Sequence, residues 1–238
     1  MDLLKELQEY QNILFHSELG KEGREYLKKR NITPNTAKIW GMGFYPNNYE
    51  SPNIFNKQLM GRIIIPVYNV YGKLISLGGR TIYDIKPKYT NYRFNNHRNL
   101  FGIYINYQNI YKKQYAIITE GQLDVITAWQ NGLDTVVCSF GAHTHIEQIA
   151  LLARYTNNIY IIYDADKAGQ SGMDVLKKID TIDINIKLIS NIFPQNEDMD
   201  SWLQTHTSKE FEEILFSLNN PSNMLKSKLN KQINQDIF

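Results

Sequence analysis

The segment Tyr115-Ala-Ile-Ile-Thr-Glu120-Gly121-Gln-Leu-Asp124-Val125 is a short apolar run followed by carboxylates and a glycine. The segment Ile159-Tyr-Ile-Ile-Tyr-Asp164-Ala-Asp166-Lys-Ala-Gly169 repeats this pattern, and a third apolar run, residues 135–139, lies between them. β-Branched runs of this length predict buried strands, and a helical pattern follows each acidic turn. Strands that alternate with helices predict a parallel sheet, which binds ligands at the carboxyl ends of its strands. Four carboxylates should therefore meet at one sheet edge: Glu120, Asp124, Asp164 and Asp166.

Carboxylates gathered in this way repel one another unless cations offset their charge. Oxygen ligands without His or Cys at matching spacing favour Mg²⁺ or Mn²⁺ over zinc. Asp164 and Asp166 are two residues apart, so their side chains share one face of an extended strand end. Asp124 has a second interpretation, because an Asp in the first turn of a helix also acts as a cap or as a partner of the helix dipole. Capping explains only one member of the pair at 164 and 166.

Composition limits the class of protein. A chain of 238 residues with 42% hydrophobic residues suits one large domain or two small ones with buried cores. The single cysteine, Cys138, excludes a disulfide framework and a cysteine-rich zinc site, and its place in an apolar strand predicts a buried, inert thiol. The chain has neither a long apolar run nor a signal-peptide pattern at its start, so we expect a soluble cytoplasmic protein without a membrane partner.

Charge is distributed unevenly along the chain. Residues 1–113 carry 17 Lys and Arg against 8 Asp and Glu, whereas residues 114–238 carry 9 against 16. The basic excess is greatest over residues 57–113, where 10 basic residues accompany one acidic residue, Asp84. A basic segment before an acidic, metal-ready one is typical of a protein that holds a polyanion beside a metal site. Ordinary solvated lysines are the alternative interpretation.

The remaining patterns predict helices and a hairpin. Residues 62–68 and 73–82 form two strands around a turn at residues 69–72, and Pro66 indicates that its strand is bent or lies at an edge. Thr144-His-Ile-Glu147 predicts a capping box that opens a helix. We also expect a fourth strand at residues 184–189 and helices at residues 2–16, 22–30, 34–40, 122–131, 144–155, 170–179 and 207–218.

A basic stretch at residues 83–104 interleaves cations with aromatic and amide side chains. Lysine and arginine pair with phosphates, tyrosine stacks on bases, and asparagine bonds base edges or sugar hydroxyls. This composition favours nucleic-acid binding, although polar loops often have it as well. Just upstream, Gly78 and Gly79 would let a ligand or another backbone approach closely, immediately before Arg80.

These motifs resemble those of a known family. Glu120-Gly-Gln-Leu-Asp124-Val resembles the first motif of the Toprim domain, and Asp164-Ala-Asp166-Lys-Ala-Gly169 resembles the second. Glu197-Asp198-Met-Asp200-Ser-Trp-Leu resembles the third acidic motif of bacterial, DnaG-type DNA primases. The resemblance extends over roughly residues 10 to 215. It includes four segments, in order, of the basic subdomain of the primase core: Arg62-Ile-Ile-Ile-Pro, Gly78-Gly-Arg80, Pro87-Lys88-Tyr89-Thr-Asn91 and Arg98-Asn-Leu-Phe-Gly102.

The resemblance implies an α/β protein in three parts. Residues 1–113 would form a basic α+β subdomain that binds template and nucleotide, residues 114–205 a Toprim domain with a mostly parallel sheet flanked by helices, and residues 206–238 a C-terminal helix and polar tail. The implied activity is synthesis of RNA primers on single-stranded DNA by two-metal nucleotidyl transfer. The implied partners are the DNA template and NTPs, with a replicative helicase and a separate zinc-binding protein as further candidates, in the cytoplasm of a bacterium, from a host or a phage gene.

The resemblance also implies roles for single residues. The catalytic carboxylates would be Glu120, Asp164 and Asp166. The ligands of two or more Mg²⁺ or Mn²⁺ ions, with no zinc, would be Glu120, Asp124, Asp164, Asp166, Asp198 and Asp200. NTP and template would be held by Arg62, Arg80, Lys88, Tyr89, Asn91 and Arg98.

Three departures from the family pattern accompany the resemblance. The zinc-binding module is not found, Asn96 stands where the family often has a lysine, and Met60 stands where it often has an arginine. Two alternatives to a primase remain at this point. A Toprim nuclease would hydrolyse phosphodiesters with the same metals but would not need the Gly-Gly-Arg and Lys-Tyr-Thr-Asn segments. A single-strand-binding scaffold without activity would not need the clustered carboxylates.

Overall fold

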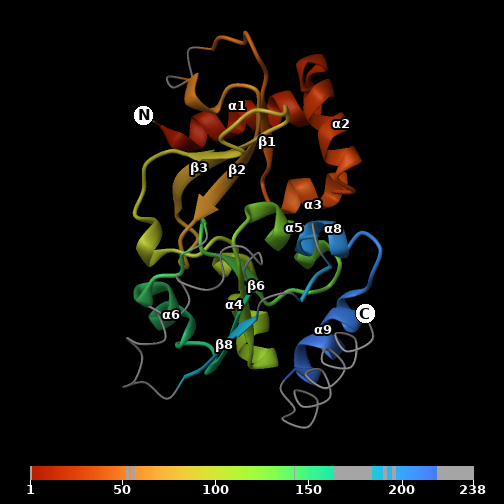
Figure 1. Cartoon of the computed structure of the whole chain (residues 1–238). Coiled ribbons are helices and arrows are strands. Elements are labelled where there is room, and N and C mark those ends of the chain that lie inside the picture. Colours follow the sequence, from red (N-terminus) through yellow and green to blue (C-terminus); the bar gives the residue numbers. More distant parts are fainter. Residues whose placement is uncertain are drawn as a thin grey trace.

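The computed structural model describes residues 2–51, 54, 57–141, 143–162, 184–189, 192–194 and 197–218. Within these residues the chain forms two four-stranded sheets, one antiparallel and one parallel, with helices around both. Figure 1 shows the antiparallel sheet in the upper half of the molecule and the parallel sheet in the lower half. The predicted α/β class, with an α+β part before a parallel sheet, is confirmed.

The first sheet, sheet A, contains the predicted hairpin. Its strand order is β1-β2-β3-β4, all antiparallel. Pro66 does not lie in an edge strand, because β2 pairs with strands on both sides. Its neighbour β1 pairs only as far as Ile64, however, so the missing N–H of Pro66 removes no bond on that side, and a register shift follows between Val67 and Tyr68. The strands are Gly43–Tyr45 (β1), Arg62–Tyr68 (β2), Leu74–Thr81 (β3) and Tyr89–Asn91 (β4).

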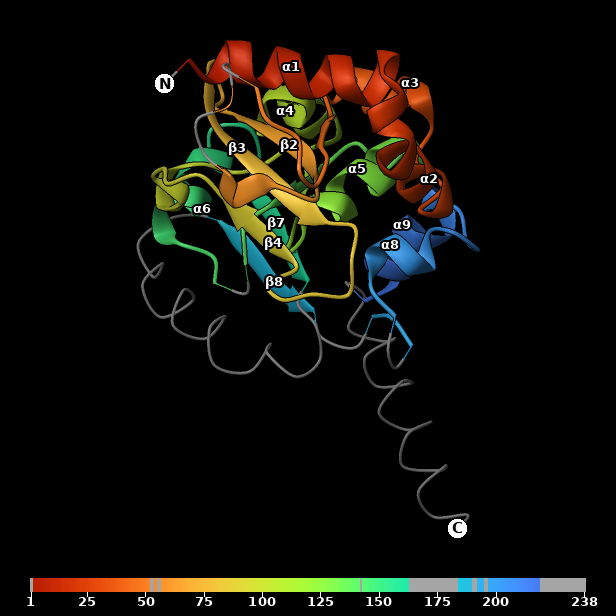
Figure 2. The ribbon, with the colours of Figure 1, turned by 90° about the horizontal axis from the view of Figure 1, so that it is seen from above.

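Three N-terminal helices accompany sheet A. They are α1 (Leu3–His16), α2 (Lys21–Lys29) and α3 (Pro34–Ile39). Asp2 caps α1, and Thr33 caps α3 with Pro34 at its first position, where the missing N–H costs no hydrogen bond. Figure 2 shows α1 lying across the sheet, with α2 and α3 beyond its C-terminal end. The apolar stripe of α1 packs against Tyr45 and Ile64.

The second sheet, sheet B, is wholly parallel, with the strand order β6-β5-β7-β8. Alternate residues face opposite sides, so Ile117 and Tyr160 join one core cluster whereas Ile118 and Ile161 join another. Both faces are buried, which explains why the strands are continuous apolar runs in the sequence. The strands are Ala116–Thr119 (β5), Val136–Cys138 (β6), Asn158–Ile162 (β7) and Asn185–Ile189 (β8).

Helices cover the two faces of sheet B. Residues of α5, α8 and α9 share a cluster with Ile117 and Tyr160, and residues of α4 and α6 share the other cluster with Ile118 and Ile161. Thr207 caps α9, because its hydroxyl accepts from the Glu210 backbone N–H at 3.2 Å. The helices are Ile103–Lys113 (α4), Gln122–Gln130 (α5), Ile146–Leu152 (α6), Met199–Trp202 (α8) and Ser208–Ser217 (α9).

The start of α6 differs from its prediction. The predicted box joined Thr144 to Glu147, but the helix begins one residue later, and the Gln148 Oε1 accepts from the His145 backbone N–H at 2.9 Å. The reason is tertiary, because the Gln148 amide turns inward and donates to the carbonyls of Asn96 and Asn99 at 3.0 and 2.8 Å. The fully buried Gln148 therefore connects α6 to the basic stretch at residues 83–104.

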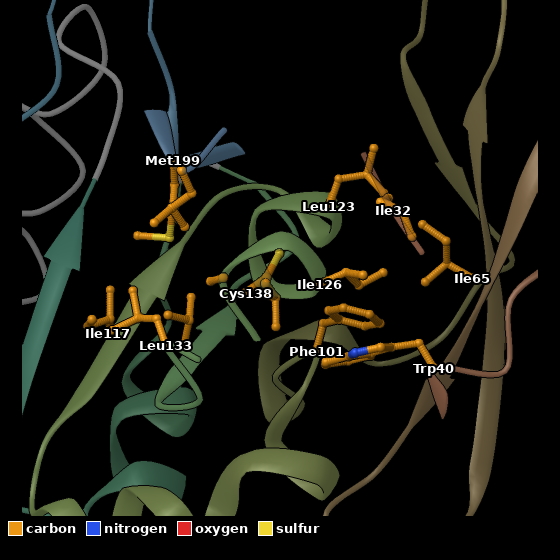
Figure 3. Packing of buried hydrophobic residues seen from close by; sticks show 14 of the residues in the cluster. Ile32, Trp40, Ile65, Phe101, Ile117, Leu123, Ile126, Leu133, Cys138 and Met199 are labelled. Atoms are coloured by element: carbon orange, nitrogen blue, oxygen red, sulfur yellow. The ribbon is translucent and has the colours of Figure 1, made fainter. Parts of the chain in front are cut away.

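One apolar core joins the two sheets. Trp40 of α3 stacks on Phe101 with ring centroids 5.2 Å apart, and both belong to the cluster that contains Ile65 of sheet A and Ile117 of sheet B. Figure 3 shows Trp40 and Phe101 between Ile65 on one side and Cys138 and Ile126 on the other. Because this core is shared, the two sheets hold a fixed position relative to each other. The division of the chain at residues 113 and 205 stays a prediction.

The described helices include none with the length and apolar character needed to cross a membrane. The predicted helix at residues 170–179 and the tail at 219–238 lie outside the described residues.

A partly buried ion pair links the N-terminal helices to the last acidic motif. The Nη1 of Arg30 lies 2.7 Å from Oδ2 of Asp200, and the other carboxylate oxygen accepts from the Thr127 hydroxyl at 2.6 Å. Asp200 is only 2% exposed, so its charge depends on these two partners. The contact joins the end of α2 to α8 and α5.

We expect Arg30→Ala to lower the free energy of unfolding by about 2 to 3 kcal/mol, because it leaves the Asp200 carboxylate buried with only a neutral partner. Urea unfolding followed by circular dichroism measures the loss. Lys28→Ala on the exposed face of the same helix is the control, and equal stability of the two variants would contradict the assignment.

A second buried carboxylate fixes α1 to the end of β4. Glu6 is fully buried, and its Oε1 accepts from the hydroxyls of Tyr10 and Tyr92 at 3.0 and 2.7 Å. These two bonds tie the first helix to the residue that follows β4.

Tyr10→Phe and Tyr92→Phe should each lower the free energy of unfolding by about 1 kcal/mol. The double variant should lose more than the sum, because Glu6 then has neither tyrosine as a donor. Thermal or urea unfolding of the four proteins tests this, with Tyr71→Phe, whose side chain is 82% exposed, as the control. Strict additivity would show that the two bonds act independently.

Candidate functional site

A cavity of about 390 Å³ lies where the carboxyl ends of β5 and β6 face sheet A. One wall consists of residues that follow the strands of sheet B, such as Glu120 and Gly141. The other wall consists of residues of β3 and β4, such as Arg80 and Tyr89. The α8 segment with Asp198 completes the lining. The first acidic turn thus lies at the carboxyl edge of the parallel sheet, whereas the predicted meeting of this turn with Asp164 and Asp166 stays a prediction.

The first acidic turn connects β5 to α5. Glu120 is half-buried in the cavity wall, and Asp124 is the third residue of α5. The Asp124 Oδ2 accepts from the backbone N–H of Gly121 at 3.1 Å, so the helix-cap interpretation of Asp124 is confirmed. A Cβ on Gly121 would lie 2.7 Å from that oxygen, so a side chain at this position would displace the Asp124 carboxylate from the bond. One carboxylate oxygen of Asp124 therefore serves the turn.

Cys138 at the end of β6 supports the same turn. Its Sγ lies 2.9 Å from the carbonyl oxygen of Glu120, and the thiol is fully buried. Burial raises the pKa of the Cys138 thiol, and Asp124 and Glu120 raise it further, so the thiol stays protonated at neutral pH. The predicted buried, inert cysteine is confirmed.

The third acidic motif divides its two aspartates between different tasks. Asp198 is exposed, lines the cavity and caps α8, accepting from the Ser201 backbone N–H at 2.8 Å. Asp200 also lines the cavity, but both of its oxygens are engaged by Arg30 and Thr127. Asp198 is thus more accessible to a ligand than Asp200.

The second acidic motif, with Asp164 and Asp166, lies outside the described residues. Within the described part of the chain, no group of three or more His, Cys, Asp or Glu side chains is close enough to hold a metal ion. The described carboxylates Glu120, Asp124, Asp198 and Asp200 thus do not form a closed cation site by themselves.

The chemistry of the cavity nevertheless suits a hard divalent cation. The metal-ligating side chains among its described residues are carboxylates from two separate segments. The nearby thiol of Cys138 is protonated and bonded to the Glu120 backbone, so it does not compete as a soft ligand. Oxygen donors of this kind suit a hard divalent cation, and the choice of Mg²⁺ or Mn²⁺ stays a prediction.

The basic wall follows from the register of sheet A. Gly78 lies opposite Asn91, and Arg80 lies opposite Tyr89. Directly opposed residues share a face, and so do residues two apart, so all four side-chain positions face the cavity. The Arg80 guanidinium carbon lies 4.8 Å from the centroid of the Tyr89 ring, which holds the cation over the aromatic face.

Tyr89 also joins the two walls. Its hydroxyl accepts from the backbone N–H of Leu123 at 3.4 Å, in the first turn of α5. Burial raises the pKa of the Tyr89 phenol, and the Asp124 carboxylate raises it further, so the ring stays neutral. Tyr89 is therefore packed between Arg80 and the acidic turn, which leaves its stacking on a base a prediction.

The structure does not bring all predicted binding residues into the cavity. Lys88 and Asn91 line it. Arg62 lies on the opposite face of the hairpin, and its Nη1 donates to the carbonyls of Pro87 and Lys88 at 3.1 and 3.3 Å, so it supports the loop before β4. Arg98 is exposed in the 3₁₀ turn Asn96–Arg98, away from the described cavity lining.

Arg30 and Gln122 are among the cavity residues that were not predicted. Arg30 gave no sequence signal, because its partner Asp200 is 170 positions away. Gln122 stands between Glu120 and Asp124 in the first acidic motif, so its position beside these predicted ligands could have indicated that it lines the site. It is 3% exposed, and neither of its side-chain polar atoms has a hydrogen-bond partner.

Comparison with known proteins agrees with this arrangement. Residues 117–203 match the model of a family described as Toprim-like. The chain is 26% identical over 256 residues to a DNA primase of Haemophilus influenzae, covering 94% of this chain and 42% of that protein. It is 32% identical over 218 residues to a DNA primase of Rickettsia bellii, covering 80% and 36%. The chain thus spans about two fifths of the length of these relatives.

A solved structure of a DnaG primase catalytic domain bound to single-stranded DNA superimposes with a TM-score of 0.78 at 25% identity, covering 91% of this chain and 77% of that one. By fold and by sequence, the chain is therefore similar to the catalytic cores of DnaG-type DNA primases, and its residues 117–203 are Toprim-like.

Proposed function

We propose that the chain synthesises RNA primers on single-stranded DNA by joining ribonucleotides. The observation that carries the proposal is the opposition of the two walls, with the carboxylates of Glu120 and Asp124 facing the cations Arg80 and Lys88 across one cavity. A nucleotidyl transfer needs both, because the nucleotide brings phosphates and the reaction needs divalent cations beside them. Similarity to the DNA primases supports the same activity.

The chain's own residues would position the nucleotide. The guanidinium of Arg80, already fixed by the Tyr89 ring and by a 3.2 Å bond from its Nε to the Tyr26 hydroxyl, would hold a phosphate in a defined orientation. Lys88, exposed at the cavity rim, would add a mobile point charge for the template or the triphosphate. In the reaction, a 3′-hydroxyl attacks the α-phosphorus, and pyrophosphate leaves.

Glu120 and Asp124, with Asp198 and the predicted ligands Asp164 and Asp166, would hold Mg²⁺ or Mn²⁺. When bound, such ions favour deprotonation of the attacking hydroxyl and offset the charge of the leaving group. Asp200 would serve the site indirectly, because its bonds to Arg30 and Thr127 fix the segment that carries Asp198. Template DNA and NTPs are the proposed substrates, and a replicative helicase and a separate zinc-binding protein are proposed partners.

Replacement of Glu120 by Gln should reduce primer synthesis at least about a hundredfold, because a neutral amide is a poor ligand for a hard divalent cation. Asp164→Asn should have the same effect. Labelled NTPs, mixed single-stranded templates and Mg²⁺ or Mn²⁺ give the measurement, with products resolved on a gel. The control is Glu147→Gln, an exposed glutamate of α6.

DNA binding should persist in both carboxylate variants. Near wild-type synthesis by both of them would remove the metal assignment. If the unaltered protein degrades the template and makes no RNA primers, the result would favour the nuclease over the primase.

Arg80→Lys should raise KM for NTPs about tenfold with little change in DNA affinity, because lysine keeps the charge but loses the planar contact with Tyr89 and the bond to Tyr26. Initial rates at varied NTP concentration measure the effect. Arg93→Lys, in the exposed part of the basic stretch, is the matched control. An unchanged KM for Arg80→Lys would show that charge alone suffices there.

A further inference from the structure

Two amide side chains from opposite walls of the cavity lie next to each other, and three of their polar atoms have no hydrogen-bond partner. The Gln122 amide from α5 and the Asn91 amide from β4 both lie over the backbone of Gly78 in β3. A Cβ at Gly78 would clash with the Asn91 Oδ1 and would lie 3.1 and 3.2 Å from the Gln122 Oε1 and Nε2. Gly78 therefore leaves the space that both amides occupy. The close approach that the sequence predicted at this glycine is thus made by these two side chains.

Three polar atoms of this pair are unsatisfied. The Oδ1 of Asn91 and both the Oε1 and Nε2 of Gln122 are buried and have no hydrogen-bond partner. Unsatisfied buried groups are rare in folded proteins and each destabilises the fold, so their presence in a cavity wall indicates that a further molecule completes the bonds. Gln122 lies at the first position of α5, directly after the acidic turn.

The kinds of atom restrict what that molecule is. Two acceptors and one donor suit a group that both donates and accepts, and a hydroxyl does both. A phosphate only accepts, and Arg80 and Lys88 in the same cavity already suit it. A base edge differs among the four nucleotides, so one fixed pair of amides does not serve template-directed synthesis, whereas the sugar hydroxyls are common to all ribonucleotides.

We infer that Gln122, with Asn91, binds a sugar hydroxyl of the ribonucleotide and so makes the cavity prefer ribonucleotides over the corresponding deoxynucleotide. This inference rests on the proposed primer synthesis. The amide atoms are covered in the structure, so binding requires a change of side-chain rotamer that carries the Gln122 amide into the cavity that this residue lines. Gln122 acts here as a residue of nucleotide specificity and takes no part in the chemistry.

The test combines a protein change with a ligand change. Affinities for ATP, 2′-deoxy-ATP and 3′-deoxy-ATP are measured by equilibrium titration in Mg²⁺ with the full chain and with Gln122→Met, which keeps the side-chain length but removes both polar atoms. We expect Gln122→Met to weaken the binding of ATP about tenfold. It should leave unchanged the affinity for the analogue that lacks the bound hydroxyl. The analogue that shows no loss identifies the hydroxyl as 2′ or 3′.

A second variant guards against a folding defect. Gly78→Ala keeps both amides but displaces them, and should reproduce the selective loss for ATP. Gln108→Met, an exposed glutamine of α4, should bind all three nucleotides as the unaltered protein does. Thermal unfolding of each variant shows whether it is folded.

The possible results separate the two proposals. Equal losses for ATP and both analogues, or no loss for any of them, would overturn the hydroxyl assignment and favour a buried water as the partner of the amides. That conclusion would hold even if the unaltered chain makes primers. Failure of the unaltered chain both to bind ATP and to make primers would instead overturn the proposed function itself.

Discussion

The shared apolar core is the constraint on which the cavity depends. Sheet A supplies cations and sheet B supplies carboxylates, and neither wall forms a site without the other. The stack of Trp40 on Phe101 and the packing of Ile65 in the same cluster as Ile126 hold the sheets at one separation. Dispersion contacts of this kind are individually weak but together resist displacement, because a close-packed interior does not deform continuously.

Charge balance adds a second constraint within that frame. Glu120 and Asp124 face a cavity, whereas Asp200, with only 2% of its surface exposed, is compensated by Arg30. The third acidic motif thus contains one aspartate, Asp200, whose charge is compensated within the protein, and another, Asp198, that is exposed to solvent. A site that receives cations and phosphates needs accessible carboxylates, and a rigid site needs their neighbours to be fixed.

Local sequence patterns predicted the elements well because local physics determines them. The apolar runs before Glu120 and Asp164, the hairpin around residues 69–72 and the helix at residues 207–218 each depend on neighbours in sequence. The position of Glu120 at the carboxyl edge of sheet B also followed from topology, since parallel strands end together.

Features that depend on distant partners escaped prediction. The cap of α6 shifted because Gln148 bonds carbonyls about 50 residues away, at Asn96 and Asn99. Arg62 resembled a phosphate ligand in the motif, yet its face of the hairpin directs it to the loop before β4. The apposition of Gln122 and Asn91 requires both the β3–β4 register and the docking of α5, and no single stretch of sequence contains both.

The end of the basic stretch at residues 83–104 has one more consequence. Phe101 forms an isolated antiparallel bridge with Cys138, donating its N–H at 2.9 Å and accepting at 3.0 Å. In sheet B, β6 is an outer strand, and such a strand offers unpaired backbone groups to strands of other molecules. By occupying these groups, the chain blocks one route to edge-to-edge aggregation with a residue whose ring also stacks on Trp40.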